Sequence, residues 1–132
     1  MCFAFFRTGC GGSIVDNVSS GGIDFPINIA TGQIGVGHGT TNNGYRKHPD
    51  TGVEVDGQYI PDWQKIKEFA CEAHRLAPDN LRLIGWDVCW NDGELSLIEG
   101  NDGPGFPELP DKHENQWKLM KEYLDLVYQS PT

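Results

Sequence analysis

The chain of 132 residues carries a formal net charge of -9 at pH 7 and has a sequence pI near 4.7. Nucleic-acid backbones and anionic membranes attract clustered lysine and arginine, so this acidic balance argues against both partners and favours a cation or a neutral one. The length predicts a single domain over residues 1–132, smaller than an enzyme that encloses a nucleotide between two lobes.

The cysteines of the chain indicate a reducing compartment. The four cysteines, Cys2, Cys10, Cys71 and Cys89, show no C-x-x-C spacing, and the sequence opens with no recognisable signal peptide. We therefore expect reduced thiols in a cytoplasmic protein, with Cys71 and Cys89 buried. No apolar run reaches the length of a membrane span. The short apolar opening, residues 2–6, predicts a strand cut from a longer protein.

The first strand is predicted to end in a charge. Residues 3–6 are apolar and precede Arg7, which shares a strand face with two phenylalanines. The Arg7 guanidinium could reach a phosphoryl group or pair with a surface acid, and the sequence favours neither. Glycine- and serine-rich loops follow at residues 8–12 and 19–22. Such loops can cradle phosphate through backbone N–H groups, although most are ordinary turns.

A second strand is predicted over residues 23–30, where large apolar residues alternate with smaller or polar ones. Pro26 favours an edge position for it, because proline cannot donate to a strand ladder. A long polar loop is expected over residues 37–57, and loops of this length in compact domains are often functional or mobile. His38 and His48 could touch substrate or metal there, but an exposed histidine without a catalytic role is the more frequent case.

Two amphipathic helices are predicted. Pro61 opens the first, where its missing N–H costs nothing, Asp62 lies in the first turn, and the helix ends before Pro78. His74 in the last turn is expected to complement the helix dipole. The second helix runs from about residue 112 to residue 128. The apolar stripes consist of Trp63, Ile66, Phe69, Ala70 and Ala73, and of Trp117, Met120, Tyr123, Leu124 and Val127.

Between the helices, residues 81–98 predict a β-hairpin with a turn at residues 91–93. A two-residue turn at Asp92-Gly93 would pair Asp87 with Ile98 and place Asp87 and Glu99 on opposite faces. A longer loop or a bulge would pair Asp87 with Glu99 directly. The sequence slightly favours the short turn.

The second register would bring three oxygen donors together, those of Asp87, Glu99 and Asn101. Facing carboxylates destabilise a sheet, so this register makes sense if a cation lies between them. Hard oxygen ligands suit Mg²⁺ or Mn²⁺, completed by water and substrate phosphate. We therefore predict a metal site at Asp87, Glu99 and Asn101, with a bulge or an odd loop near residues 91–94.

These residues carry a resemblance to a known family. Asp87, Glu99 and Asn101, within GWDV and LIEGN, resemble the metal-binding signature in the C-terminal part of ATP-grasp ligases. FRTGCGGSIVDNVSSGGIDFPINIATGQI resembles the same superfamily, in which a strand arginine is followed by an asparagine and paired glycines. Arg7, Asn17 and Gly21-Gly22 occupy those places.

Three further phrases resemble a narrower group. HPDTG, IPDWQKIKEFACEAH and LIGWDV…LIEGNDGPGF are similar to the ATP-grasp group associated with sugar transfer, which is sometimes named together with hexapeptide-repeat transferases. Almost the whole chain is covered, with two departures. The adenine-binding, lysine-bearing N-terminal lobe of an ATP-grasp enzyme has no counterpart here, and no hexapeptide repeat is visible.

The predicted elements and the resemblance imply an α+β domain, in which both amphipathic helices cover one face of an antiparallel sheet. This arrangement resembles the C-terminal subdomain of the ATP-grasp fold. The expected core comprises Trp63, Phe69, Trp86, Val88, Trp90, Trp117 and Leu124. The opposite face would carry Arg7 and the three metal ligands, open towards a nucleotide.

The resemblance implies the metal- and phosphate-binding half of an ATP-dependent ligase, which activates a carboxylate as an acyl phosphate in polysaccharide or cell-envelope biosynthesis. Asp87, Glu99 and Asn101 would hold Mg²⁺ or Mn²⁺, while Arg7 would stabilise the transferring phosphoryl charge and, with Asn17, bind ATP. The partners would be a nucleotide and a carboxylate substrate. Without the N-terminal lobe, the isolated chain is expected to lack ligase-level activity. The alternative is a non-catalytic module that binds a cation or a partner chain through its acidic face, or an acidic surface with no bound ion.

Overall fold

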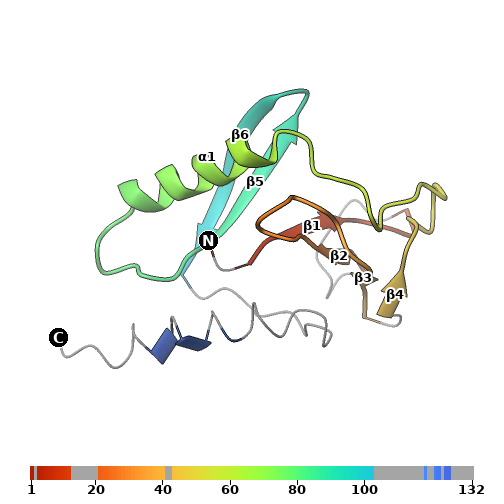
Figure 1. Cartoon of the computed structure of the whole chain (residues 1–132), viewed down its shortest axis with the longest axis horizontal. Coiled ribbons are helices and arrows are strands. Elements are labelled where there is room, and N and C mark those ends of the chain that lie inside the picture. The colour runs from red at the N-terminus through yellow and green to blue at the C-terminus, as the bar shows by residue number, and fades with distance from the viewer. Residues whose placement is uncertain are drawn as a thin grey trace. The chain divides into compact units, whose positions relative to one another are not determined.

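The computed structural model describes residues 1, 3–12, 21–40 and 43–102, together with five helical positions near the C-terminus. By contacts the chain divides into two compact units, formed by residues 3–63 and by residues 64–132. The elements in chain order are β1 (Phe5–Thr8), β2 (Ile23–Pro26), β3 (Gly37–His38), β4 (Asn43–Tyr45), α1 (Trp63–Leu76), β5 (Gly85–Asn91) and β6 (Glu94–Asn101) (Figure 1).

The first unit is built on an antiparallel sheet with the strand order β1-β2-β3-β4. Its core lies on one face of β2, where Ile23 and Phe25 are 1% and 0% exposed. Ile34 and Val55 join them in one buried cluster. This cluster differs from the predicted core, because β2 is paired on both sides and its apolar face is covered by later segments of the same unit.

The edge position predicted for β2 is therefore wrong. Pro26 is the last residue of β2, opposite Phe5 of β1, so its missing N–H falls where the strand ends. Its carbonyl oxygen accepts a hydrogen bond from the Gly35 N–H at 2.8 Å. A proline at the end of a strand can thus occupy a central position in a sheet.

The long polar loop predicted over residues 37–57 is also wrong in part. It contains β3 and β4, and a backbone bridge joins Lys47 to Glu54. Val55 from the same segment is 7% exposed and belongs to the core. The polar sequence obscured this arrangement because the two strands comprise only two and three residues.

Trp63 closes the first unit at the point where α1 begins. Its indole N–H donates to the carbonyl oxygen of Ile29 at 2.7 Å. The ring lies against Gly32, whose φ is +79° and where an added Cβ would come within 2.8 Å of the Trp63 Cβ. Glycine is thus required at the turn that receives the tryptophan.

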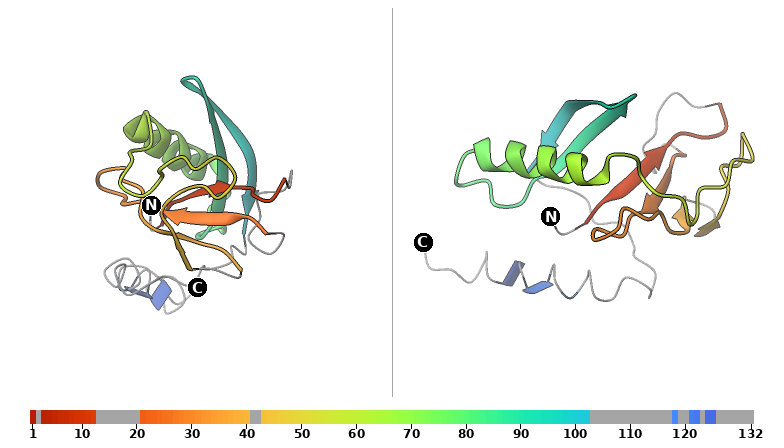
Figure 2. Two further views of the ribbon diagram at one scale, coloured as in Figure 1. Left: turned by 90° about the vertical axis from the view of Figure 1, so that its right-hand side faces the viewer. Right: turned by 45° about the horizontal axis from the view of Figure 1, so that its top comes forward.

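Helix α1 starts later than predicted and ends as predicted. Asp62 has a φ of 54°, so Pro61 and Asp62 form a turn before the helix and no acidic residue lies in its first turn. The helix stops at Leu76, before Pro78, with His74 in its last turn. The helix lies alongside the hairpin formed by β5 and β6 (Figures 1 and 2). On its solvent side, a hydrogen bond from Arg75 lowers the pKa of the Glu72 carboxyl.

The α+β class with antiparallel sheets is confirmed, but the single predicted sheet is two sheets, one of four strands and one of two. Trp90 of the expected core is 38% exposed. The second predicted helix lies outside the described residues, apart from five positions that are helical. These positions are Lys118, Lys121, Glu122, Leu124 and Asp125. The arrangement of two helices on one face therefore stays a prediction.

The burial predicted for two cysteines is wrong. Cys71 and Cys89 are exposed, and both are free thiols, as is Cys10. Cys71 follows the buried Ala70 on α1, and one residue along a helix turns the side chain towards solvent. Cys89 alternates with the half-buried Val88 on β5. No helix in the described part of the chain combines the length and apolar character needed to cross a membrane.

Candidate functional site

The hairpin turn is the short one that the sequence favoured. Asp92 and Gly93 have φ values of 49° and 87°, the pattern of a type I′ turn. Asn91 and Glu94 face each other at its base. The prediction of an odd loop or a bulge near residues 91–94 is therefore wrong in its location.

A bulge lies further along β6. The ladder continues in one register as far as Val88 opposite Leu97, and the next pair is Asp87 opposite Glu99. Ile98 is thus the extra residue, and it is 65% exposed. One extra residue shifts the alternation of side chains by one. The predicted pairing of Asp87 with Glu99 is confirmed, although it arises from a bulge at Ile98.

The bulge assembles an acidic face on the hairpin. Asp87 and Glu99 are directly opposite each other, and Asn101 lies two residues beyond Glu99, opposite Gly85. Side chains two apart on a strand share a face, so Asp87, Glu99 and Asn101 are neighbours. All three are exposed, and Gly85 contributes no side chain beside Asn101.

The chemistry of this face fits a hard divalent cation. Within the described part of residues 64–102, no lysine, arginine or histidine nitrogen lies within 4.0 Å of the Asp87 or Glu99 carboxylate. Two carboxylates directly opposite each other repel, and a cation relieves that repulsion. Among the described residues, no group of three or more His, Cys, Asp or Glu side chains is placed to hold a metal. The predicted set contains two carboxylates and an amide, so protein oxygens alone would leave several positions for water or phosphate.

The opposite face of the hairpin holds it against α1. Trp86 lies over Gly100, where an added Cβ would come within 2.9 Å of the Trp86 Cε3. His74 of α1 meets the Trp86 ring edge-on, with a centroid distance of 6.5 Å and an interplanar angle of 89°. The Trp86 Nε1 is buried and has no hydrogen-bond partner in the described structure. Because Trp86 and Asp87 alternate, packing of Trp86 against α1 turns Asp87 outward.

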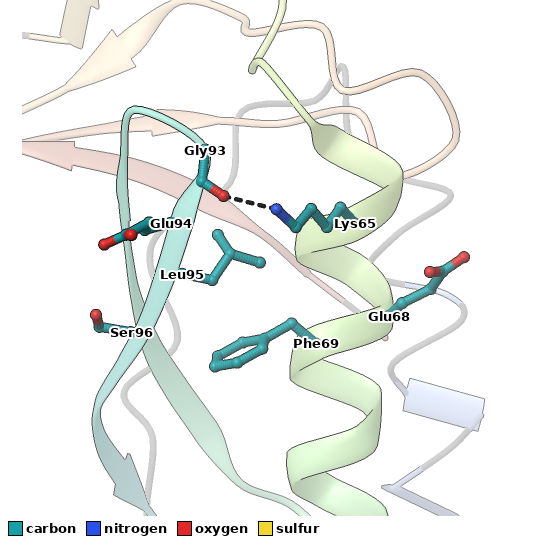
Figure 3. A pocket seen from close by; sticks show the side chains of 7 residues that line it. All are labelled: Lys65, Glu68, Phe69, Gly93, Glu94, Leu95 and Ser96. Atoms are coloured by element: carbon teal, nitrogen blue, oxygen red, sulfur yellow. Dashed lines mark hydrogen bonds between the residues drawn. The ribbon is translucent and has the colours of Figure 1, made fainter.

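A pocket of about 580 Å³ lies between α1 and the hairpin tip (Figure 3). Phe69 and Leu95 point towards each other across it, and the Lys65 ammonium donates to the carbonyl oxygen of Gly93 at 2.6 Å. The pocket lining does not include the three predicted metal ligands, so this hollow and the acidic face are separate features. The apolar stripe of the helix gives no sign of this hydrogen bond, which joins residues 28 positions apart in the chain.

In the first unit, Arg7 pairs with a buried acid. Arg7 of β1 faces Asp24 of β2, and the Arg7 Nε donates to the Asp24 Oδ1 at 2.9 Å. The Asp24 side chain is 10% exposed and the Arg7 side chain 41%. The carboxylate therefore orients a guanidinium that solvent can still reach. Sequence reasoning missed Asp24 because the alternation placed it on the polar face of a half-buried strand.

His38 continues the same row of residues. It faces Asp24 across β2 and β3, on the sheet face opposite Phe25. Its Nε2 is buried and has no hydrogen-bond partner among the described residues. The expectation of an exposed loop histidine is therefore wrong for His38, because the segment that contains it pairs as a strand.

His48 also differs from the expected exposed loop histidine. It is half-buried, and its Nε2 lies 2.8 Å from the carbonyl oxygen of Gly9, just beyond β1. Asn17, the other predicted nucleotide-binding residue, belongs to residues 13–20, which lie outside the described part of the chain. Its predicted role stays a prediction.

The fold and the hairpin are compatible with a part of an ATP-grasp protein. The family model of the sugar-transfer associated ATP-grasp proteins matches residues 1–112. The chain belongs to this family. Membership gives it an ATP-dependent, ligase-like fold, and proteins of the family generally use ATP and Mg²⁺. Comparisons with curated proteins and with solved structures found no match.

Proposed function

We propose that this chain is the metal- and phosphate-binding C-terminal lobe of an ATP-dependent ligase. The observation that carries the proposal is the bulged register, which sets Asp87 opposite Glu99 with Asn101 beside them. Membership of the ATP-grasp family is the reason for proposing ATP as the nucleotide. The reaction we infer joins a carboxylate substrate to an amine or another nucleophile, in polysaccharide or cell-envelope biosynthesis in the cytoplasm.

In this reaction a carboxylate oxygen of the substrate attacks the γ-phosphorus of ATP, and ADP leaves as the acyl phosphate forms. The nucleophile then attacks the acyl carbon and inorganic phosphate departs. Bound Mg²⁺ would neutralise charge on the phosphate oxygens during transfer. Asp87, Glu99 and Asn101 would hold that ion with their oxygens.

Arg7 is the residue we assign to the transferring phosphoryl group. Its guanidinium carries a permanent charge, and Asp24 engages its Nε at 2.9 Å. Because Asp24 already orients the guanidinium, little further free energy is needed to orient it when charge develops on the phosphate. Asn17, within the glycine-rich segment that follows, would contact the nucleotide.

A magnesium titration of the purified chain, followed by NMR of the hairpin amides, tests the metal site. We expect millimolar Mg²⁺ to shift the amides around Asp87 and Glu99, and Asp87→Asn to abolish that response. Asp92→Asn is the matched control, because it removes a carboxylate of the same hairpin at the turn, away from the acidic face. Asparagine also tolerates the positive φ at that position. An unchanged Mg²⁺ response in Asp87→Asn would contradict the assignment.

The same pair of carboxylates supports a second candidate, a non-catalytic module that binds a cation or a partner chain. Its basis is the exposure of all three oxygen-bearing side chains on one face. The two candidates differ in their response to nucleotide. A module of this kind would respond to Mg²⁺ and show no further change with ATP, whereas a ligase lobe should respond to Mg·ATP at Arg7 as well.

A further inference from the structure

The turn formed by residues 48–52, the sequence HPDTG, is stabilised by hydrogen bonds within residues 48–53. The Gly52 N–H donates to the carbonyl oxygen of His48 at 2.8 Å, and the His48 N–H donates to the carbonyl oxygen of Val53 at 2.8 Å. The Val53 N–H meets the Thr51 Oγ1 at 3.3 Å. These bonds fix the backbone that carries the His48 and Asp50 side chains.

His48 binds the chain that leaves β1. Its Nδ1 accepts a hydrogen bond from the Asp50 N–H at 3.3 Å, so the proton of a neutral ring resides on Nε2. The Nε2–H donates to the carbonyl oxygen of Gly9 at 2.8 Å, and the Thr8 Oγ1 lies 3.3 Å away. The turn thus sets the tautomer in which the ring can hold the Gly9 carbonyl.

Asp50 holds the same segment two residues further on. The Gly11 N–H points at its carboxylate, with nitrogen to oxygen distances of 3.1 Å and 2.9 Å. Gly11 and Gly12 have φ values of 67° and 75°, a backbone region that only glycine occupies readily. A charge-assisted hydrogen bond to one of these glycines restricts a segment that would otherwise sample many conformations.

The held segment begins directly after Arg7 and Thr8, the last residues of β1. The Cys10 thiol also donates to the carbonyl oxygen of Gly21, at 2.9 Å. The segment that follows Arg7 and Thr8 in the chain is therefore bound on both sides of Cys10. Nothing in the proposed chemistry uses His48 or Asp50 directly, so this geometry needs a separate explanation.

We propose that the 48–52 turn is a clasp, in which His48 and Asp50 act as positioning residues for residues 9–12 and so for phosphoryl-group binding at Arg7. This inference rests on the proposed function, because it assumes that Arg7 meets a phosphoryl group. An ordered glycine segment directly after the strand that carries Arg7 lowers the entropic cost of binding that group.

The test uses Asp50→Ala, with Asp50→Asn as the conservative variant, since an asparagine oxygen still accepts the Gly11 N–H. Glu54→Ala is the matched control. It removes a carboxylate close to the same turn. The Glu54 side chain is 70% exposed, and its Oε1 lies 3.7 Å from the Lys47 Nζ. Thermal melting verifies that each variant is folded. Two quantities are measured by NMR, namely hydrogen exchange at the Gly11 amide and the chemical-shift response of residues 7–12 to Mg·ATP.

We expect Asp50→Ala to speed exchange at Gly11 at least about tenfold, because a hydrogen bond to a charged group is lost. The midpoint of the Mg·ATP response should rise about threefold to tenfold. Asp50→Asn should recover most of both effects, and Glu54→Ala should change neither. His48→Ala, tested in the same way, should also weaken the Mg·ATP response.

Unchanged exchange at Gly11 in Asp50→Ala would overturn the clasp. Faster exchange with a wild-type Mg·ATP response would reduce the contact to a purely structural one and overturn the positioning role. A tighter Mg·ATP response in Asp50→Ala would mean that the carboxylate competes with the ligand anion at Gly11, which also overturns the proposal. If the wild-type chain shows no Mg·ATP response at all, the proposed function fails first and the positioning role fails with it.

Discussion

Asp24 is the buried charged side chain in the described part of the chain, and its partner Arg7 is the residue assigned to the phosphoryl group. Burying a carboxylate among apolar neighbours is unfavourable unless it is paired and hydrogen-bonded. An ion pair with one buried and one exposed partner is weak evidence for stability. Its clearer consequence is that the Arg7 side chain has one preferred orientation.

We predict that Asp24→Asn lowers the free energy of unfolding by about 1–2 kcal/mol, because a neutral amide oxygen replaces a charged acceptor in a buried place. The Arg7 Nε–H resonance should move as its partner loses charge. Asp56→Asn, which alters a more exposed pair with Arg46, should cost less than about 1 kcal/mol. Denaturant unfolding and NMR measure both effects. Equal losses in the two variants would show that burial of Asp24 is unimportant.

Glu99 is predicted to matter for cation binding and not for folding. Without metal, Glu99→Gln removes a repulsion with Asp87, so the melting temperature in chelator should stay the same or rise. Any stabilisation by Mg²⁺ should disappear, because binding to the folded state alone produces that shift. Glu94→Gln, on the same strand, is the control that should keep the Mg²⁺ shift. A large loss of stability in chelator would instead make Glu99 a structural partner.

The sequence identified the residues of the acidic face but not the partners of Arg7 and His48. Asp87, Glu99 and Asn101 stand close together in the chain, and strand alternation relates them directly. Asp24 lies 17 residues from Arg7, and Gly9 lies 39 residues from His48. Pairs at such separations depend on the order of strands in the sheet, which residue types alone do not fix.

At the scale of elements, the hairpin depends on the packing of Trp86 over Gly100. An alanine at position 100 would bring its Cβ within 2.9 Å of the Trp86 Cε3, closer than atoms in contact approach. We predict that Gly100→Ala destabilises the chain by about 1–3 kcal/mol, the usual cost of overpacking. It should also weaken the Mg²⁺ response of the hairpin, since Gly100 lies between Glu99 and Asn101.

Gly44→Ala provides the control for that substitution, because an added Cβ there meets nothing within 4 Å. Thermal unfolding and the magnesium titration are the two measurements. If Gly100→Ala were as harmless as Gly44→Ala, Trp86 would be free to move away and would not fix the acidic face.

The sequence predicted the hairpin and its turn, but left its register open. Alternation along residues 94–98 fits the short turn, and the signal of the bulge is the pair of adjacent apolar residues Leu97-Ile98, which breaks that alternation. Both are substantially exposed, at 42% and 65%, so burial does not decide which of them faces α1. The register is instead consistent with Trp86 packing over Gly100 and against His74 of α1, contacts that the alternation of apolar residues does not reveal.

At the scale of the whole molecule, the α+β class followed from the spacing of strands and helices, whereas the division into two sheets did not. Hydrophobic alternation shows that a strand has a buried face and says nothing about which strands share a sheet. The predicted core of tryptophans followed from assuming one sheet. Ile23 and Phe25 are among the most buried side chains, in a strand for which Pro26 had favoured an edge position.

Taken alone, the chain of 132 residues is expected to bind nucleotide weakly. The residues assigned to metal and phosphate lie within it, whereas the lysine-bearing lobe that covers the adenine in ATP-grasp enzymes is predicted not to lie within these residues. Positioning supplies much of the catalysis in phosphoryl transfer, so a half-site with intact ligands should lose most of it. We therefore expect Mg·ATP to bind with a dissociation constant in or above the millimolar range, equivalent to about 4 kcal/mol or less.

Turnover at ligase-like rates should be absent. Calorimetry with Mg²⁺ and ATP measures the dissociation constant on the purified chain, and an assay for ADP release measures turnover. Asp87→Asn is the control that separates binding through the acidic face from non-specific association of nucleotide. Micromolar binding accompanied by turnover would mean that a second copy or an unrecognised segment completes the site. In that case the acidic face would belong to a working enzyme, and the description of this chain as an incomplete ligase would be wrong.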